Sequence, residues 1–503
     1  MQRVPPLLRQ RLAGALLVTS AALVAGGSAG AQAVGGDDTR LRLGQGIDRR
    51  SDDAERQLLE AVEDIGSGPA TIRIDGRTYT VNRNASEMGE ALYIAVARRQ
   101  WPDARRFLKA YLALPGRDPM LVFYAEGALA RQARDLASAE RHYRALLKLQ
   151  PDFLPGRLEL ARVLFESRKD RAALAAFRQA QAALDAQGDK AAGIRQTVET
   201  FLKVLRRRSG WQGSLAIGPG YSSNLNQSSA SYACLLTGED GTCLIDRKVP
   251  DAIQAAGINF EGTLSRRAPI GGNGGIAGRA LLYGDIYRGH GAYNQATLST
   301  QIGYDHQSSR GSFALGPSFD IGSLGSAMLY TALGVRGEAM VNAADNTALR
   351  IELSRKVLDY RLPAYRNFDG AQTEAYLTSW YGVSRGLSLF GGPDFVDKTA
   401  DNAANAYRQL GVRLGMNKSF GKAVSLLAFT SLRWRDYRAY SELLAAKRHD
   451  REQNIVAIVK LPVLRFAGLT PNILVQHNRV ESNVDWLYSY KRTTAAMRLE
   501  HAF

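Results

Sequence analysis

The chain of 503 residues lacks long hydrophobic runs beyond its N-terminal stretch, since no later segment offers about eighteen consecutive apolar residues. An ordinary transmembrane helix is therefore excluded. If such a chain enters a membrane, it must do so as a closed β-barrel, because only helices and barrels satisfy every backbone polar group in lipid. Cysteine is also scarce, with only Cys234 and Cys243 present. In an oxidising compartment we expect these two to form a disulfide that stiffens a surface loop.

Motifs for enzymatic chemistry are missing as well. The patterns HExxH, CxxC and GxxxxGK[ST] do not occur, and the six histidines are scattered. Asp305-His306 and His449-Asp450 imitate part of a hydrolytic site, but neighbours in a regular strand point to opposite faces. We therefore predict no catalytic residues, no cofactor, no metal site and no enzymatic activity. Any transport must then be passive or driven by the substrate.

Residues 1–33 have the features of a secretory signal peptide. Three arginines among the first eleven residues precede the apolar stretch Leu12–Ala25, and small residues follow, with cleavage expected after Ala31 or Ala33. No cysteine stands at the cleavage site, so lipid attachment there is excluded. The formal charge of +17 suggests an anionic partner, but export argues against nucleic acid. A basic surface that faces anionic lipid headgroups is the simpler interpretation.

Residues 34–85 form a polar lead-in that contains one small predicted β-hairpin. Thr71–Ile74 and Arg77–Val81 alternate in polarity and are joined by Asp75-Gly76. Asp-Gly between two alternating runs is a strong short-range hairpin signal. Two strands alone are marginally stable, so this hairpin must pack on the next segment of the chain.

Residues 86–210 are predicted to form a helical solenoid, because a period of 34 residues is visible in a segment rich in Ala, Leu, Glu and Arg. Small residues at fixed places let paired helices approach closely, and aromatic residues fill the space between neighbouring pairs. Generic helical hairpins without a peptide groove remain an alternative. The residues at tetratricopeptide signature positions are Phe123, Gly127, Ala139, Tyr143, Pro151, Ala161, Ala173 and Phe177.

Residues 211–503 change to a period of two. Leu410, Val412 and Leu414, for example, alternate with more polar or smaller neighbours. A soluble sandwich would show the same alternation, but three further features favour a transmembrane barrel. Tight connections alternate with long ones, the strand count is an even fourteen, and the chain stops on a strand that places Phe503 on its apolar face. We expect strands of about ten residues and a barrel assembly signal at Phe503.

The opposite face of these strands carries charge. Either a net-basic lumen keeps an aqueous path open, or these residues simply make up the polar interior that every such barrel has. The basic residues predicted to face the lumen are Arg336, Arg350, Arg413, Arg433 and Arg435.

The order of these parts resembles Slam, the surface lipoprotein assembly modulators of Gram-negative bacteria. The short sequence motifs that carry this resemblance are Trp211-Gln212, the segments 220–226, 448–451 and 468–471, and Ser482-Asn483-Val484. The resemblance implies an N-terminal tetratricopeptide-like α-solenoid in the periplasm, followed by a 14-stranded antiparallel β-barrel in the outer membrane. It also implies a type XI secretion translocon that moves lipidated or soluble client proteins, often for iron or haem acquisition.

The predicted function is therefore an outer-membrane translocon that receives an exported client protein in the periplasm and delivers it to the cell surface. The barrel assembly machinery, and also periplasmic chaperones, are its expected partners, and no nucleic acid is expected. A polysaccharide export porin with tetratricopeptide repeats is the main alternative, and a barrel enzyme and a simple porin are others. An even number of strands would place Trp211 and Phe503 on the same, periplasmic side.

Overall fold

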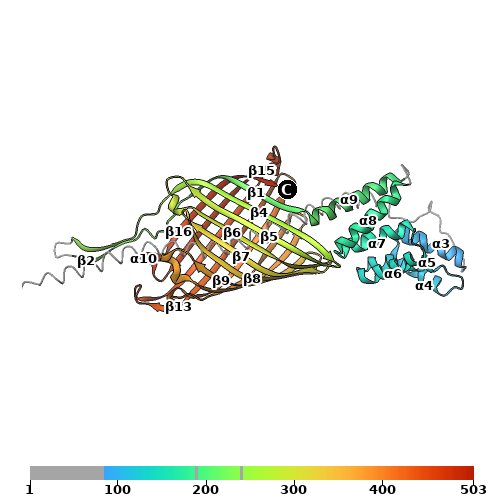
Figure 1. Cartoon of the computed structure of the whole chain (residues 1–503), viewed down its shortest axis with the longest axis horizontal. Helices are drawn as coiled ribbons and strands as arrows, with labels where there is room; N and C mark the ends of the chain where they lie inside the picture. The colour runs from blue at the N-terminus through green and yellow to red at the C-terminus, as the bar shows by residue number, and fades with distance from the viewer. Residues whose placement is uncertain (1–83, 187–190, 238–241) are drawn as a thin grey trace, which may run out of the picture.

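The computed structural model describes residues 84–186, 191–237 and 242–503. A helical domain stands at one end of a β-barrel, and the two are joined directly at Gly210 (Figure 1). The predicted signal peptide and the hairpin predicted within residues 71–81 lie outside the described residues. The end of the barrel that carries the helices is called the helical end, and the opposite one the far end.

The helical domain consists of paired antiparallel helices followed by one longer helix. Side chains cap several of them, as when Asp118 and Asp135 accept hydrogen bonds from backbone N–H groups of the first turn. The helices are α3 (Ala85–Ala97), α4 (Trp101–Leu112), α5 (Pro119–Gln132), α6 (Leu136–Leu149), α7 (Leu154–Glu166), α8 (Asp170–Asp185) and α9 (Ala192–Ser209).

Small residues let the paired helices approach closely. A Cβ atom at Gly127 would lie 2.9 Å from the Tyr143 ring, so α5 and α6 meet with no room for a side chain there. Ala139 and Ala173 are fully buried at the corresponding contacts. The ring of Phe177 stacks on that of Phe201 at 4.9 Å, which extends the core into α9.

The turn between paired helices is the same in three successive repeats. Arg99, Arg134 and Arg168 adopt positive φ angles of 57°, 59° and 60°. The residue after each donates its N–H back to the preceding helix, as Asp135 does to the carbonyl of Ala130. Glycine usually occupies this left-handed position, and here arginine does.

Within the described part of the chain, fourteen antiparallel strands close into a barrel in which β1 pairs with β4 and β16. Together with the helical repeats, this confirms the predicted fold class. The barrel strands are β1 (Trp211–Ser222), β4 (Ala255–Gly271), β5 (Gly274–Tyr287), β6 (Gln295–Ser308), β7 (Gly311–Leu324), β8 (Ala327–Ala344), β9 (Thr347–Tyr360), β10 (Gly370–Ser384), β11 (Leu387–Lys398), β12 (Tyr407–Phe420), β13 (Val424–Ser441), β14 (Ala446–Lys460), β15 (Leu469–Ser482) and β16 (Tyr490–Ala502).

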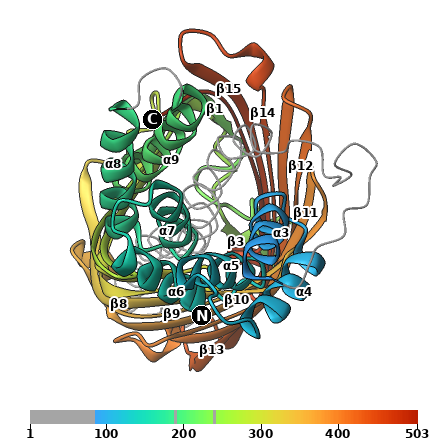
Figure 2. The ribbon, with the colours of Figure 1, turned by 90° about the vertical axis from the view of Figure 1, so that its right-hand side faces the viewer.

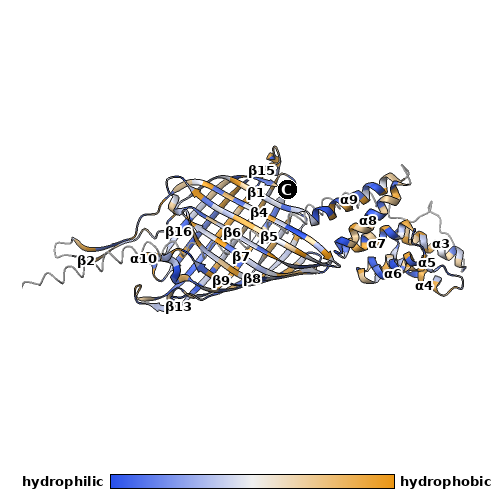
Figure 3. Cartoon of the chain, viewed as in Figure 1, coloured by the Kyte–Doolittle hydropathy of each residue, from blue (hydrophilic) through white to orange (hydrophobic). Residues whose placement is uncertain are grey.

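Hydrophilic and hydrophobic residues alternate along the strands that face the viewer in Figure 3, and successive side chains of a strand point to opposite faces of the barrel wall. On β12, Leu410 and Leu414 are exposed to the outside, whereas Gln409 and Arg413 are buried inside. The strands are longer than the expected ten residues, reaching 18 in β8 and β13. The residues from Tyr437 to 453 belong largely to β13 and β14, and only residues 442–445 form the loop between them.

Most of the longer connections lie at the far end, although residues 461–468 between β14 and β15 form a longer connection at the helical end. The first contains the two-stranded sheet of β2 (Tyr232–Thr237) and β3 (Cys243–Lys248), which projects beyond the barrel, and another contains α10 (Asp485–Tyr488) (Figure 1). Cys234 and Cys243 are disulfide-bonded across this sheet, with Cα atoms 5.8 Å apart. Among the described helices, none is both long and apolar enough to cross a membrane.

Candidate functional site at the mouth of the barrel

The helices curve around the barrel mouth, with α3, α5 and α7 on the inside of the curve and α4, α6 and α8 outside (Figure 2). Aromatic rings join the inner helices. The ring centroid of Tyr124 lies 6.3 Å from that of Tyr93 and 6.1 Å from that of Phe153. Tyr93 is 49% exposed. This row, the inner aromatic row (Tyr93, Tyr124 and Phe153), offers an apolar surface with hydroxyl groups at its edge.

The environment of Tyr124 keeps its hydroxyl protonated. Burial, with a smaller contribution from the nearby Glu159 carboxylate, raises the pKa of Tyr124 to about 12. A phenol that never ionises near neutral pH remains a hydrogen-bond donor and an apolar contact at once. Tyr124 therefore contributes a neutral hydroxyl group and an apolar ring to the inner aromatic row.

Ion pairs connect successive repeats. Arg131 on α5 binds Glu159 at 3.1 Å and Glu166 at 2.5 Å, both on α7. Glu140 on α6 binds Lys169 at 2.7 Å. Burial opposes ionisation of Glu140, but the hydrogen bonds from Lys169 and Arg144 outweigh it and hold the pKa of this carboxyl below its usual range. The second and third repeats of the solenoid are thus joined by ion pairs.

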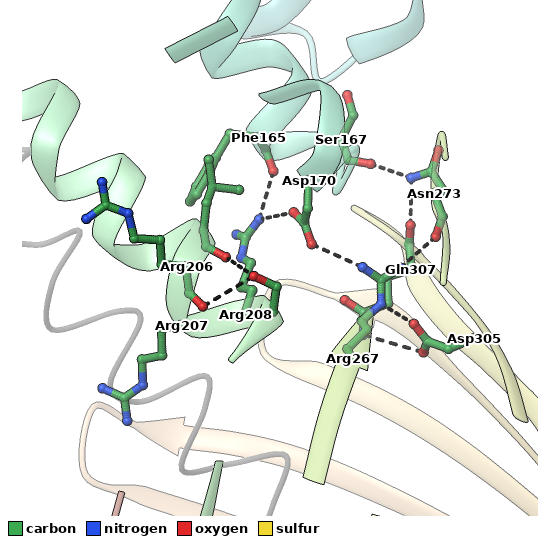
Figure 4. A network of polar contacts seen from close by, with 12 residues as sticks. Phe165, Ser167, Asp170, Arg206, Arg207, Arg208, Arg267, Asn273, Asp305 and Gln307 are labelled. Carbon is green, nitrogen blue, oxygen red and sulfur yellow. Dashed lines mark hydrogen bonds and ion pairs between the residues drawn. The ribbon is translucent and has the colours of Figure 1, made fainter. Parts of the chain in front are cut away.

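The solenoid is fixed to the barrel by a buried network around Asp170 (Figure 4). The Asp170 carboxylate accepts a hydrogen bond at 2.7 Å from Arg208 on α9 and pairs at 3.2 Å with Arg267 on β4. Arg267 also pairs with Asp305 on β6. All four side chains are less than a tenth exposed. One carboxylate therefore joins the solenoid, the connecting helix and the barrel wall.

Neighbouring contacts complete this junction. The Asn273 side chain, in the turn between β4 and β5, donates to the carbonyl of Ser167 at the end of α7 (Figure 4). The guanidinium of Arg208 lies 3.9 Å from the centre of the Phe165 ring. Arg171 donates to the carbonyl of Ile270 at 2.8 Å. We call this set, together with Asp170, Arg267 and Asp305, the junction network.

A second contact between solenoid and barrel is exposed. Arg134 pairs at 2.8 Å with Asp345 in the turn between β8 and β9, and both side chains are about four-fifths exposed. Exposed ion pairs contribute little to stability. In the described residues, the solenoid therefore contacts the rim tightly near α8 and loosely near α6.

The tetratricopeptide signature residues lie in the packing of the solenoid. Ala161, Tyr143 and Phe177 are buried, and Phe123 packs 6.4 Å from the ring of His142. Pro151 begins the turn before α7 and accepts a hydrogen bond from Arg157. These residues build the scaffold that presents the inner aromatic row, and they do not line it.

The five arginines predicted to face the lumen are buried on the inner side of the wall, each at 8% exposure or less. Asp394 lies 3.2 Å from Arg413 and 3.6 Å from Arg433. Glu452 lies 3.3 Å from Arg435. Arg413, Arg433 and Arg435 are thus ion-paired with two carboxylates, which fits the structural interpretation of a polar, ion-paired interior better than an open basic lining.

The two remaining lumen arginines lie on β8 and β9. Arg350 lies over the Trp380 ring, with its guanidinium carbon 5.7 Å from the ring centre, and the Arg336 carbonyl accepts a hydrogen bond from Gln301. Sequence reasoning missed an apolar patch elsewhere on the inner wall. It consists of Phe390, Phe429, Val456, Ile458, Leu474 and Ala496.

The two residue pairs that resemble fragments of a hydrolytic site have other partners in the structure. Asp305 belongs to the junction network, and the His449 ring lies 2.6 Å from Asp436 rather than beside Asp450. In the parts of the chain that the structure describes, no group of His, Cys, Asp and Glu is arranged to hold a metal ion. Phe503 is 57% exposed, and its backbone pairs with Gly213 of β1 at 3.0 and 3.1 Å.

Comparison with known proteins identifies this arrangement of parts. The model of the surface lipoprotein assembly modifier family matches residues 211–503, and the model of that family's N-terminal TPR repeats matches residues 75–177. The chain belongs to the surface lipoprotein assembly modifier family. This confirms the resemblance to Slam and the location of the barrel in the outer membrane.

Two curated relatives span most of the chain. The hemophilin secretion modulator of Acinetobacter baumannii is 37% identical, covering 93% of this chain and 96% of its own length. Surface lipoprotein assembly modifier 1 of Haemophilus influenzae is 23% identical, covering 81% and 83%. Among solved structures, the outer membrane channel DcaP of Acinetobacter baumannii covers 58% of this chain and 96% of its own at 9% identity. Its TM-score is 0.34.

Proposed function

We propose that this protein is an outer-membrane translocon for a client protein. The client arrives in the periplasm, binds the inner face of the solenoid in an extended form, and passes through the barrel to the surface. It is either a surface lipoprotein or a soluble secreted protein, as in haem acquisition. Family membership and the name of the A. baumannii relative support a protein client over a polysaccharide. We assign no catalytic step to the chain.

The observation that carries the proposal is the position of the solenoid. The junction network holds it at the barrel rim, so its inner helices curve around the mouth (Figure 2). A client bound along the inner aromatic row is thereby kept next to the entrance. Holding two partners in a fixed relation raises their effective concentration, so even weak binding to the row is sufficient for entry.

Other partners act before and during this transfer. Periplasmic chaperones would keep the client unfolded until it reaches the solenoid, and the barrel assembly machinery would insert the barrel itself. Phe503 is the proposed recognition signal for that machinery, because an outward aromatic residue ends the last strand. Replacing Phe503 with Ala should reduce the amount of folded barrel in the outer membrane.

The test is surface exposure of a client encoded beside this gene, co-expressed with the full-length protein or without it. Exposure should require the protein. The variant Tyr93→Ala removes an inner aromatic side chain that is 49% exposed, and Leu149→Ala removes an apolar side chain at the end of α6 that is 54% exposed. We expect Y93A to lower client exposure and L149A to leave it unchanged. Client exposure that is the same with and without the protein would overturn the proposal.

A further inference from the structure

The outward faces of β14, β15 and β16 carry a cluster of charged residues near one end of the barrel. Outward residues elsewhere are mostly apolar, such as Leu215 and Ile217 on β1 or Leu333 and Val335 on β8. On these three strands the outward face turns polar toward the far end. The polar residues there are Arg451, Gln453, Arg479, Glu481 and Lys491, all of them exposed, and together we call them the outer notch.

The strand register brings these side chains together. Arg451 stands opposite Glu481, and Gln453 opposite Arg479, on β14 and β15. Lys491 on β16 stands opposite Arg479. Directly opposed residues on one face have Cβ atoms about 5 Å apart, so their side chains share one small area. A pocket lies there, lined by Arg451, Gln453, Arg479 and Glu481.

The outer notch lies at the border of the apolar belt. Toward the helical end the same outward faces carry Ile455, Val475 and Met497, each 41–64% exposed. Trp434 on β13 is directly opposite Arg451 and is 45% exposed. Aromatic residues mark the level of lipid headgroups in such barrels. Because the helical end faces the periplasm, this level is that of the outer leaflet.

The charges in the outer notch are not balanced by the protein. Glu481 pairs with Arg479. Within the described residues, the side chains of Arg451 and Lys491 have no ion pair, and the notch carries three basic residues against one acidic one. A cation on the lipid face of a barrel is destabilising unless an anion meets it. The missing counter-ion must therefore come from the membrane or the solvent.

We propose that the outer notch binds a phosphate group of the lipopolysaccharide in the outer leaflet. Guanidinium groups offer paired donors to phosphate oxygens, and a lysine ammonium adds a compact charge beside them. Gln453 supplies a neutral donor at the same site. The acyl chains would then lie on the apolar belt below, over Ile455, Val475 and Met497.

The experiment measures binding of lipopolysaccharide to the full-length protein in lipid nanodiscs. The triple variant Arg451→Gln, Arg479→Gln, Lys491→Gln removes the basic groups of the outer notch. The matched control is Arg408→Gln, which removes an exposed outward arginine of β12 that already pairs with Asp397. We expect the triple variant to bind about tenfold more weakly, because charge-assisted hydrogen bonds are lost, and R408Q to bind as the unaltered protein does.

Two further arms separate the possible ligands. Lipopolysaccharide stripped of its phosphates should lose the same affinity as the triple variant, and inorganic phosphate alone should compete only weakly. Equal binding by the triple variant and R408Q overturns the proposal, and so does competition by inorganic phosphate at the same concentration as the lipid. Heat-modifiable gel migration reports whether each barrel is folded. If the triple variant is not folded, the single variant R451Q replaces it with the same expected direction.

Discussion

The same turn occurs in three successive repeats of the solenoid, but its surroundings differ in each. The first, at Arg99, belongs to the repeat farthest along the chain from the barrel. The second, at Arg134, forms an exposed ion pair with the rim, and the third, at Arg168, lies beside Asp170 in the buried junction network. The same turn thus connects two helices at Arg99, contacts the rim loosely at Arg134 and is fixed to the barrel at Arg168. The strength of the contact depends on how deeply its partners are buried, and not on the turn itself.

Asp170→Asn should have the largest effect. It leaves Arg208 and Arg267 at a buried site without the carboxylate between them, and breaking a buried ion pair costs about 3–5 kcal/mol. We expect the helical domain of the full-length protein to unfold at a lower temperature and client exposure to fall. Circular dichroism at the helical band measures the first effect, and surface labelling of the client measures the second.

The matched control for this change is Asp152→Asn. Asp152 also pairs with an arginine, Arg157, but its side chain is 93% exposed. D152N should therefore leave both readouts unchanged. If D170N and D152N behaved alike, the buried contact would be no more important than an exposed one. Burial would then not explain why the turns differ in how firmly they attach the solenoid.

Gly127→Ala tests the rigidity of the solenoid between its two contacts with the barrel. The added Cβ would lie 2.9 Å from the Tyr143 ring, so the helices must move apart, at a cost of about 1–3 kcal/mol. The control is Gly193→Ala on α9, where a Cβ meets no atom within 4 Å. G193A should be neutral or stabilising, because alanine favours helices. Thermal unfolding of both variants gives the comparison, and destabilisation by G193A of the same size as by G127A would contradict the packing argument.

Arg99→Gly should stabilise the protein by about 1 kcal/mol, because a non-glycine residue in the left-handed region carries strain that glycine does not. The neighbouring Arg98 has an ordinary φ of −92°, so Arg98→Gly should destabilise instead. Thermal unfolding distinguishes the two. Changes of opposite sign in the unfolding temperature are the decisive result, since both variants remove one arginine from the same turn.

The repeats and the strands could be predicted from the sequence, because both depend on periodicity. Gly127, Ala139 and Tyr143 recur at a spacing that helical pairs impose, and the alternation around Leu410 follows from the pleat of a strand. The junction network could not be predicted. Asp170 and Asp305 are joined through Arg267 across long stretches of chain, and no local pattern distinguishes these residues from other charged ones.

The inner apolar patch was missed for a related reason. The run Ile455–Val459 is apolar at every position, so alternation cannot tell which of its side chains face inward. In the structure Val456 and Ile458 point into the patch, whereas Ile455 is exposed outside. A run that is apolar at every position places apolar side chains on both faces of the barrel wall. Such a run therefore indicates an apolar area inside the barrel.

Arg134→Ala should have the smallest effect of these substitutions. The Arg134–Asp345 pair is about four-fifths exposed on both sides, so its loss should cost less than about 1 kcal/mol, and salt should screen it further. Unfolding temperature and client exposure should both stay close to those of the unaltered protein. Combined with D170N, however, R134A removes the second contact with the rim. A double variant that exports client no worse than D170N alone would show that the exposed turn does not hold the solenoid, and that the junction network alone positions it over the mouth.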